Sequence, residues 1–198
     1  IIRPVMAKLS DLIVSKVRVK LLKIFLGQSK NLFYVRELTR LTKEEINAIR
    51  RELENLSKAG LLTSEKRGNR LYYSVKTSYE LYPELVNLLA KSTGAGKLLI
   101  KNRSKLGFVK YLFISQKLSR GLVRGPEDVD MVIVGKLIMP QVNQTVRAVE
   151  KILNTEINYS CMTEEEFNYR KSHKDPFIIK VLLQPKIVLI GDEISLQI

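Results

Sequence analysis

The sequence predicts an α+β protein of two domains, residues 1–92 and 93–198. Short amphipathic helices and a hairpin pattern dominate the first half, whereas strands and helices alternate in the second. A glycine-rich segment at residues 93–96 interrupts the helical pattern and marks the boundary. With 198 residues and 45% hydrophobic content, the chain can bury two small cores.

The first half opens with an apolar helical pattern that ends at Gly27. The apolar residues of this helix are Val17, Leu21, Ile24 and Phe25. Residues 32–35 predict a short strand, and residues 36–41 predict a second short helix. We expect this second helix to turn Leu38 and Leu41 inward.

A third helix is predicted to begin near Lys43. Thr42 and Glu45 have the spacing of a capping box, in which a hydroxyl and a carboxylate each satisfy a free amide at a helix start. Gly60 supplies the left-handed residue that ends the helix. Its buried stripe is expected to contain Ile46, Ile49, Leu53 and Leu56.

Two strands joined by a basic turn follow this helix. They are expected at residues 61–65 and 70–75, with the turn at residues 66–69. Gly68 and Asn69 tolerate the positive φ that a hairpin tip requires. One face of the second strand carries Leu71, Tyr73 and Val75.

This order of strand, two helices and basic hairpin resembles the winged helix-turn-helix of small bacterial and archaeal regulators. In that fold the helix from Lys43 enters the major groove of duplex DNA, and the hairpin straddles phosphates. The matching residues are Glu37-Leu38, Leu53, Leu56, Ala59-Gly60-Leu61 and Arg67-Gly68-Asn69-Arg70-Leu71-Tyr72-Tyr73.

The resemblance implies DNA contacts from the third helix and the turn. Asn47, Arg50 and Arg51 are the base-reading candidates, and the basic turn is expected to hold the backbone. The alternative is that these residues are ordinary solvated charges or belong to a protein-binding surface. The turn has no acidic neighbour after Glu65, which favours DNA. The residues expected at DNA are Lys43, Asn47, Arg50, Arg51, Lys66, Arg67 and Arg70.

The charge distribution also favours a nucleic-acid partner. The net charge is +14 and the pI about 9.9. Up to Ser92 the chain has 18 basic and 9 acidic residues, and after it 16 and 11, so the excess lies mainly in the first half. A membrane surface is the competing explanation for basicity, but no long apolar span or lipid-binding helix is visible. We therefore expect no membrane association.

Cys161 is the single cysteine and His173 the single histidine. This excludes a structural zinc site of the Cys/His type and any disulfide within the chain. Residues 1–4 lack a charged region followed by an apolar core, so no signal peptide is expected. These observations predict a reducing, cytoplasmic environment.

The second half is preceded by a helix at residues 79–92, whose apolar face is expected to carry Leu81, Leu85, Leu88 and Leu89. An amphipathic helix with a basic face is predicted at residues 97–105. After Phe108 the pattern predicts a small α/β layer structure. Strands are expected at residues 109–115, 128–135 and 156–162, and helices at 141–153, 163–170 and 177–183. Residues 187–190 are short enough for a strand or a core segment.

Two aspartates open the second of these strands. Strand alternation would place Asp128 and Asp130 on one face, roughly 6.6 Å apart along the chain, where their carboxylates can converge on one hard cation. Ionised acids beside an apolar strand are costly unless something pairs them. Magnesium with a nucleotide phosphate is one such partner, and Arg120 or Arg124 is another.

The order of these residues resembles the minimal nucleotidyltransferases of the DNA polymerase β superfamily. The resemblance implies that Ser115 and Arg120 bind nucleotide, and that Asp128 and Asp130 bind Mg²⁺ together with a nucleoside triphosphate. With the first half, the likeness spans nearly the full chain. The matching segments are Phe113-Ile114-Ser115, Arg120-Gly121, Asp128-Val129-Asp130 and Gly135, followed by residues 156–159, 165–167, 175–177 and 186–191.

Two departures from that family argue against catalysis. Ile114 stands where the family has the glycine of a tight phosphate-binding turn. Asn158 stands where a third carboxylate is expected, and Glu156 lies one step away from that position. Two readings stay open with equal weight: nucleotide binding without turnover, and an inert scaffold whose acids are paired by Arg120 and Arg124.

The leading hypothesis is a homodimeric, DNA-binding transcriptional regulator. Its second domain would be a degenerate nucleotidyltransferase-like domain that senses a nucleotide or mediates assembly. The rival is an active Mg-dependent nucleotidyltransferase that modifies a protein, RNA or small-molecule hydroxyl. A third hypothesis is a toxin–antitoxin component whose second domain binds a partner protein.

Overall fold

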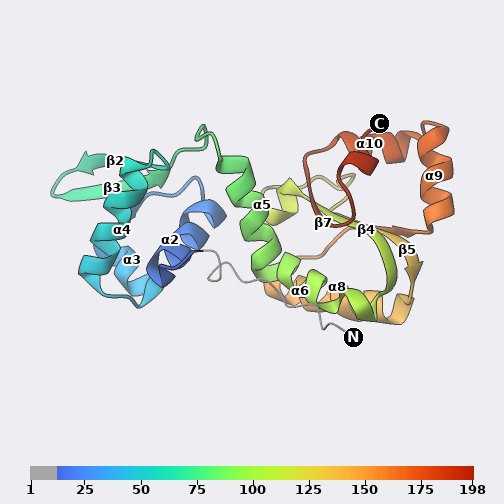
Figure 1. Cartoon of the computed structure of the whole chain (residues 1–198), viewed down its shortest axis with the longest axis horizontal. Helices are drawn as coiled ribbons and strands as arrows, with labels where there is room; N and C mark the ends of the chain where they lie inside the picture. Colours follow the sequence, from blue (N-terminus) through green and yellow to red (C-terminus); the bar gives the residue numbers. More distant parts are fainter. Residues whose placement is uncertain (1–12) are drawn as a thin grey trace. The chain divides into compact units, whose positions relative to one another are not determined.

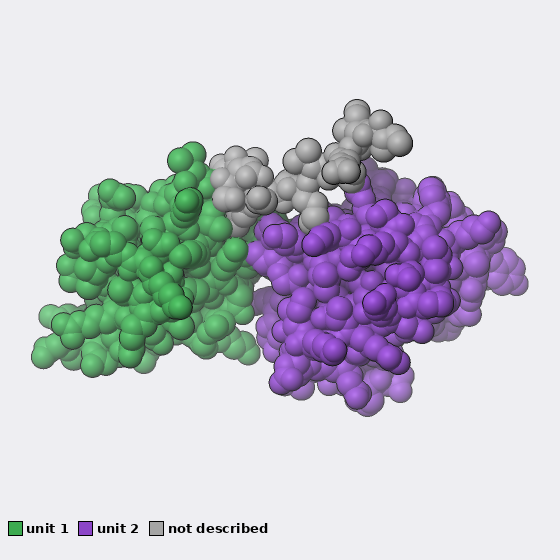
Figure 2. All heavy atoms as spheres, turned by 90° about the horizontal axis from the view of Figure 1, so that it is seen from below, with its two compact units in different colours: residues 1–89 green, residues 90–198 purple. Residues whose placement is uncertain are grey.

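A computed structural model of the protein describes residues 13–198, so the signal-peptide prediction for residues 1–4 lies outside the described part. The chain divides into two compact units, unit 1 ending at Leu89 and unit 2 beginning at Ala90 (Figure 2). Both units mix helices and strands, which confirms the α+β class. Within residues 13–198, no helix has the length and apolar character needed to cross a membrane.

Unit 1 contains a three-stranded antiparallel sheet in the order β1-β3-β2. Gly68, with φ of 57°, forms the tip of the hairpin as expected. The chain passes into unit 2 within α5. The elements are α2 (Lys16–Gly27), β1 (Phe33–Tyr34), α3 (Val35–Thr42), α4 (Ile46–Lys58), β2 (Leu62–Arg67), β3 (Arg70–Val75) and α5 (Tyr82–Ser92) (Figure 1).

Helices α2, α3 and α4 bury one apolar side each to form the core of unit 1. Phe25 of α2 meets Phe33 of β1 edge to face, with ring centres 5.5 Å apart. Two inward-facing predictions were wrong. Leu41 is 56% exposed because it lies on the outer side of α3, and Leu81 is 53% exposed because it precedes α5. The fully buried residues at the centre are Leu21, Phe25, Leu38, Ile49 and Leu53.

Helix α4 begins at Ile46 rather than near Lys43. Lys43 instead ends α3 in the left-handed conformation, with φ of 53°. The predicted capping box does not form, because the Thr42 hydroxyl donates to the Leu38 carbonyl inside α3. Glu45 alone caps α4, accepting hydrogen bonds from the first amides of the helix.

Unit 2 is built on a four-stranded sheet in the order β6-β5-β4-β7. Strand β4 is antiparallel to both its neighbours, whereas β5 and β6 are parallel and are joined through α8. The elements are α6 (Gly94–Asn102), η1 (Arg103–Lys105), β4 (Gly107–Ser115), α7 (Gln116–Ser119), β5 (Met131–Leu137), α8 (Met139–Leu153), β6 (Tyr159–Met162), α9 (Glu164–Ser172), α10 (Pro176–Leu183), β7 (Lys186–Ile190) and η2 (Ile194–Leu196).

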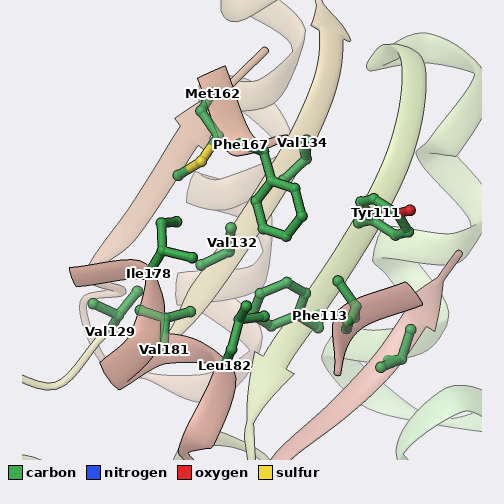
Figure 3. Close-up of a cluster of buried hydrophobic side chains, with 12 residues drawn as sticks. Tyr111, Phe113, Val129, Val132, Val134, Met162, Phe167, Ile178, Val181 and Leu182 are labelled. Carbon is green, nitrogen blue, oxygen red and sulfur yellow. The ribbon is translucent and has the colours of Figure 1, made fainter. Parts of the chain in front are cut away.

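Side chains on both faces of this sheet are buried. Phe113, Val132 and Val134 contribute to one apolar cluster, together with Phe167 of α9 and Ile178 of α10 (Figure 3). The alternate residues of β4 and β5 face the other side of the sheet, where α6 and α8 lie (Figure 1). Burial on both faces explains the nearly continuous apolar runs in these strands.

The strands begin later than expected at the acidic end of the sheet. Strand β5 starts at Met131, so Asp128 and Asp130 belong to the loop before it and strand alternation does not apply to them. Strand β6 starts at Tyr159, after Glu156 and Asn158. The backbone carbonyl of Glu156 and the backbone amide of Asn158 make hydrogen bonds with the loop before β5.

Replacing Gly135 by alanine is expected to destabilise unit 2 by more than about 1 kcal/mol. Gly135 has φ of 148°, and an added Cβ would lie 2.1 Å from the carbonyl oxygen of Phe108, beside the irregularity in the β4–β5 ladder. Gly27→Ala is the matched control, because no atom lies within 4 Å of its added Cβ. Urea unfolding of both variants measures the difference, and equal stabilities would contradict the close approach.

A buried carboxylate joins α4 to α2 in unit 1. Glu52 is 5% exposed and accepts hydrogen bonds from the Ser15 hydroxyl at 2.7 Å and from Nε of Arg18 at 2.8 Å. Burial opposes ionisation of Glu52, but the hydrogen bonds from Ser15 and Arg18 outweigh it and hold its pKa below the ordinary value of 4.5. The ionised form is therefore favoured in the folded state.

Glu52→Gln is expected to lower the free energy of unfolding by about 1 kcal/mol at pH 7. Because the folded pKa is depressed, the stabilisation in the parent protein is complete above pH 4.5 and is lost as pH falls through the folded value. The gap between parent and variant should therefore be smaller at pH 3 than at pH 7. Urea unfolding at both pH values tests this, and a gap of unchanged size at pH 3 would argue against the assignment.

Candidate nucleic-acid interface and acidic site

The exposed side of α4 carries the residues expected to read bases. Asn47, Arg50 and Arg51 are all exposed. The Asn47 carboxamide oxygen lies 3.5 Å from a guanidinium nitrogen of Arg50, so these two side chains adjoin near the start of the helix. Arg51 borders a different feature, a cavity of about 680 Å³ that Glu52 also lines. The structure thus brings the side chains of Asn47 and Arg50 together, whereas Arg51 lines a different cavity.

Lys43 does not lie on α4. It is exposed in the turn between α3 and α4, because α4 starts three positions later. Its expected place on the groove-facing side of the helix was therefore wrong. The turn position leaves Lys43 able to contact a nucleic-acid backbone, as a flexible point charge can.

The hairpin presents Lys66, Arg67 and Arg70, all exposed. Arg67 has one acidic neighbour, Glu65, which is the last acidic residue before the turn. Its guanidinium pairs with Glu65 at 2.5 Å, because residues two apart on a strand share a face. Arg67 also lies over the Tyr72 ring, 5.9 Å from its centre. This ion pair is exposed on both sides, so an approaching phosphate can compete for Arg67 at small cost.

Two arginines of α3 were missed in the sequence. Arg36 and Arg40 are exposed one turn apart and line a pocket with Tyr34 and Arg70. Their four-residue spacing, which places two cations on one side of a helix, was the available signal. Tyr34 of β1 and Arg70 of β3 line the same pocket but are far apart in the sequence, so the sequence alone did not show that they lie together.

The acidic pair of unit 2 lies in a pocket of about 340 Å³ before β5. Asp130 is 2% exposed, and the guanidinium of Arg124 donates to its Oδ2. The same guanidinium donates to the Thr155 hydroxyl at 2.5 Å and to the Glu156 carbonyl at 3.1 Å. The Asn158 amide completes the shell of Oδ2 at 2.9 Å. Asp130 is therefore held by a cation from its own chain.

Asp128 is held in the same manner. Its Oδ2 accepts from Nζ of Lys117 at 2.7 Å and from the Gly125 amide at 2.8 Å. The hydrogen bond from Lys117, followed by that from Gly125, lowers the pKa of Asp128. The sequence named Arg120 and Arg124 as pairing partners; Arg124 is confirmed, whereas Lys117 is the cation at Asp128.

The residues expected to bind nucleotide do not line this pocket. Ser115 is buried and caps the short helix α7, accepting a hydrogen bond from the Leu118 amide at 3.1 Å. Ile114 packs in the sheet at 2% exposure, opposite Met131 and Ile187. Arg120, just after α7, is half-buried. Ser115 and Ile114 therefore have structural roles, Ser115 as the cap of α7 and Ile114 in the packing of the sheet.

The donor set fits a resident magnesium pair poorly. Among residues 13–198, no group of three or more His, Cys, Asp or Glu side chains could hold a metal ion. Arg124 occupies Oδ2 of Asp130, and Glu156, whose side chain is exposed, contributes its backbone carbonyl. Oδ1 of Asp130 is nevertheless buried without a hydrogen-bond partner, so one acceptor of this pocket is unused.

Cys161 and His173 offer no chemistry at this pocket. Cys161 is half-buried in β6, and burial raises its pKa to about 11, so its thiol stays protonated at neutral pH. His173 is exposed after α9, with Nδ1 2.9 Å from the Tyr169 carbonyl. His173 thus belongs to a surface turn.

Comparison with protein-family models, curated proteins and solved structures finds no match for this chain. The two family resemblances therefore stay predictions. The features of the chain that bear on its function are the exposed cations of unit 1 and the paired acids of unit 2.

Arg124→Ala is expected to lower the free energy of unfolding by about 3 kcal/mol, because it leaves the buried Asp130 carboxylate without its counter-charge. Arg103→Ala, at an exposed position in η1, serves as control and should change stability by under about 0.5 kcal/mol. The double variant Arg124→Ala/Asp130→Asn should recover part of the loss. Chemical denaturation of all four proteins measures these values, and a double variant no more stable than Arg124→Ala would exclude the pairing.

Proposed function

We propose that the chain binds duplex DNA through unit 1 as a winged helix-turn-helix regulator. The observation that carries this proposal is that the start of α4 adjoins the basic hairpin. Ile46, the first residue of α4, and Arg70 of the hairpin line the same pocket. A groove-entering helix and a phosphate-contacting hairpin must adjoin in this way to engage one duplex.

The topology of unit 1 supports the same proposal. One strand precedes α3 and α4, and the β2–β3 hairpin follows them, with β3 central in the sheet. Glu45 engages the amides of Asn47 and Ala48, so base reading falls to the side chains of Asn47 and Arg50. Asparagine and arginine are the side chains that pair with adenine and guanine edges.

For unit 2, we infer a nucleotidyltransferase-like domain that assembles the regulator as a homodimer or binds nucleotide without turnover. The support is the pairing of Asp128 with Lys117 and of Asp130 with Arg124, which supplies from the chain the positive charge that metal ions supply in active relatives of that superfamily. Magnesium-dependent pyrophosphate release from any nucleoside triphosphate, abolished by Asp130→Ala, would refute this inference.

Lys66→Ala is expected to weaken DNA binding on all sequences and to reduce the slope of log affinity against log salt by about 0.9, the value for one lost phosphate contact. Arg50→Ala should instead cost about 1–3 kcal/mol on the preferred site and relax the preference for one base. The measurement is fluorescence anisotropy over a salt series, on duplexes selected from a random pool.

Lys23→Ala is the control for this experiment, since Lys23 is exposed on α2, away from the hairpin in the sequence. It should change neither the slope nor the preference. Failure of the parent protein to bind any duplex saturably, or identical behaviour of the three variants, would refute the proposed function.

A further inference from the structure

A pocket of about 410 Å³ opens in unit 1 among α3, β1 and the hairpin. Three of its lining residues carry guanidinium groups and none carries a carboxylate. Its volume lies within the range of about 300–1,000 Å³ that is usual for ligand pockets. The lining residues are Tyr34, Arg36, Thr39, Arg40, Ile46 and Arg70.

Tyr34 fixes two of the three guanidinium groups. Nη2 of Arg40 donates to the Tyr34 hydroxyl at 3.1 Å, and the guanidinium of Arg70 lies 4.8 Å from the centre of the Tyr34 ring. Tyr72 lies opposite Tyr34 in the sheet and supports its ring edge-on, with centres 5.5 Å apart. Because the Tyr34 oxygen accepts from Arg40, its own proton is available to a ligand in the pocket.

The charges of this pocket are not balanced by the protein. Within the described part of the chain, Arg36, Arg40 and Arg70 form no ion pair with a carboxylate. Other basic residues of unit 1, such as Arg18 and Lys20, do form such pairs. Like charges gathered around one cavity repel each other, and a bound anion relieves that repulsion.

We propose that this pocket binds a phosphate group. The guanidinium fork matches phosphate oxygens in a bidentate manner, and a phosphate has enough oxygens to engage three arginines at once. The Tyr34 hydroxyl adds a neutral donor, and Ile46 supplies an apolar wall against which the sugar of a nucleotide can pack. The Thr39 hydroxyl already donates a hydrogen bond to the Val35 carbonyl and takes no part in binding the phosphate.

The site is separate from the base-reading residues of α4 and does not require the proposed function. Arg36 and Arg40 belong to α3, and only Arg70 is shared with the expected DNA contacts. The phosphate can come from the backbone of a duplex or from a free nucleotide. The same three side chains recognise both.

The test uses two probes on the full chain, adenosine 5′-monophosphate followed by amide chemical shifts and a duplex followed by anisotropy. Arg36→Ala and Arg40→Ala should each weaken nucleotide binding about tenfold, or reduce the salt slope of duplex binding by about 0.9. Tyr34→Phe, which keeps the ring and removes the hydroxyl, should act in the same direction. Lys23→Ala is the control with one exposed charge removed.

Each outcome decides the proposal. Weaker nucleotide binding with unchanged duplex binding identifies a free phosphate as the ligand, and a smaller salt slope without nucleotide binding identifies the DNA backbone. Arginine variants that match Lys23→Ala with both probes overturn the proposal, even when the protein binds DNA. A parent protein that binds the nucleotide but no duplex retains this site and refutes the proposed function.

Circular dichroism checks that the variants fold, as expected for exposed arginines. Arg36→Lys and Arg40→Lys replace either alanine variant that unfolds. They keep the charge but lose the fork, and should weaken binding in the same direction.

Discussion

Asp130, whose carboxylate is buried, joins three segments of unit 2 that are distant in sequence. The backbone carbonyl of Asp130 accepts from the Ser115 amide at the end of β4, and the backbone amide of Asp130 donates to the Asn158 carbonyl before β6. Its Oδ2 accepts from the Asn158 amide and from Arg124 of the preceding loop. A buried charge with this many partners is retained only when each partner stays in place, so the end of the sheet depends on this residue.

That arrangement limits the chemistry of the acidic pocket. Oδ2 of Asp130 already accepts from Arg124 and from a backbone amide, so a metal ion could bind this oxygen only by displacing one of them. Asp128 is likewise engaged by Lys117 and by the Gly125 amide. The carboxylates therefore stabilise the loop before β5, and Oδ1 of Asp130 is buried without a hydrogen-bond partner.

In unit 1 the cations are distributed differently. Buried Glu52 pairs with Arg18 and serves the packing of α2 on α4. The arginines around Tyr34 are held by an aromatic ring and its hydroxyl, which orient guanidinium groups without neutralising them. Positive charge that is positioned but not balanced is suited to an external anion. The aromatic residues of β1 and β3 thus orient part of the positive charge of unit 1 at one position on its surface.

Most elements of the fold could be predicted from the sequence, because they depend on local periodicity. The helix ending at Gly27, the hairpin with Gly68 at its tip and the strand and helix order of unit 2 all followed from apolar spacing and turn chemistry. It also identified Arg124 as a partner for the acids, since a nearby cation was the obvious alternative to a metal.

The start of α4, the exposure of Leu41 and the position of the acids depended on how the elements pack. The Thr42 hydroxyl could accept from an amide at the start of α4 or donate to a carbonyl of α3. In the folded protein it donates to the Leu38 carbonyl, and Glu45 caps α4 instead. The phosphate pocket was hidden for the same reason: Arg36 and Arg70 meet only because β3 pairs with β1. Periodicity along a chain reports which side of an element is buried, whereas contacts between side chains far apart in sequence exist only after the elements have packed.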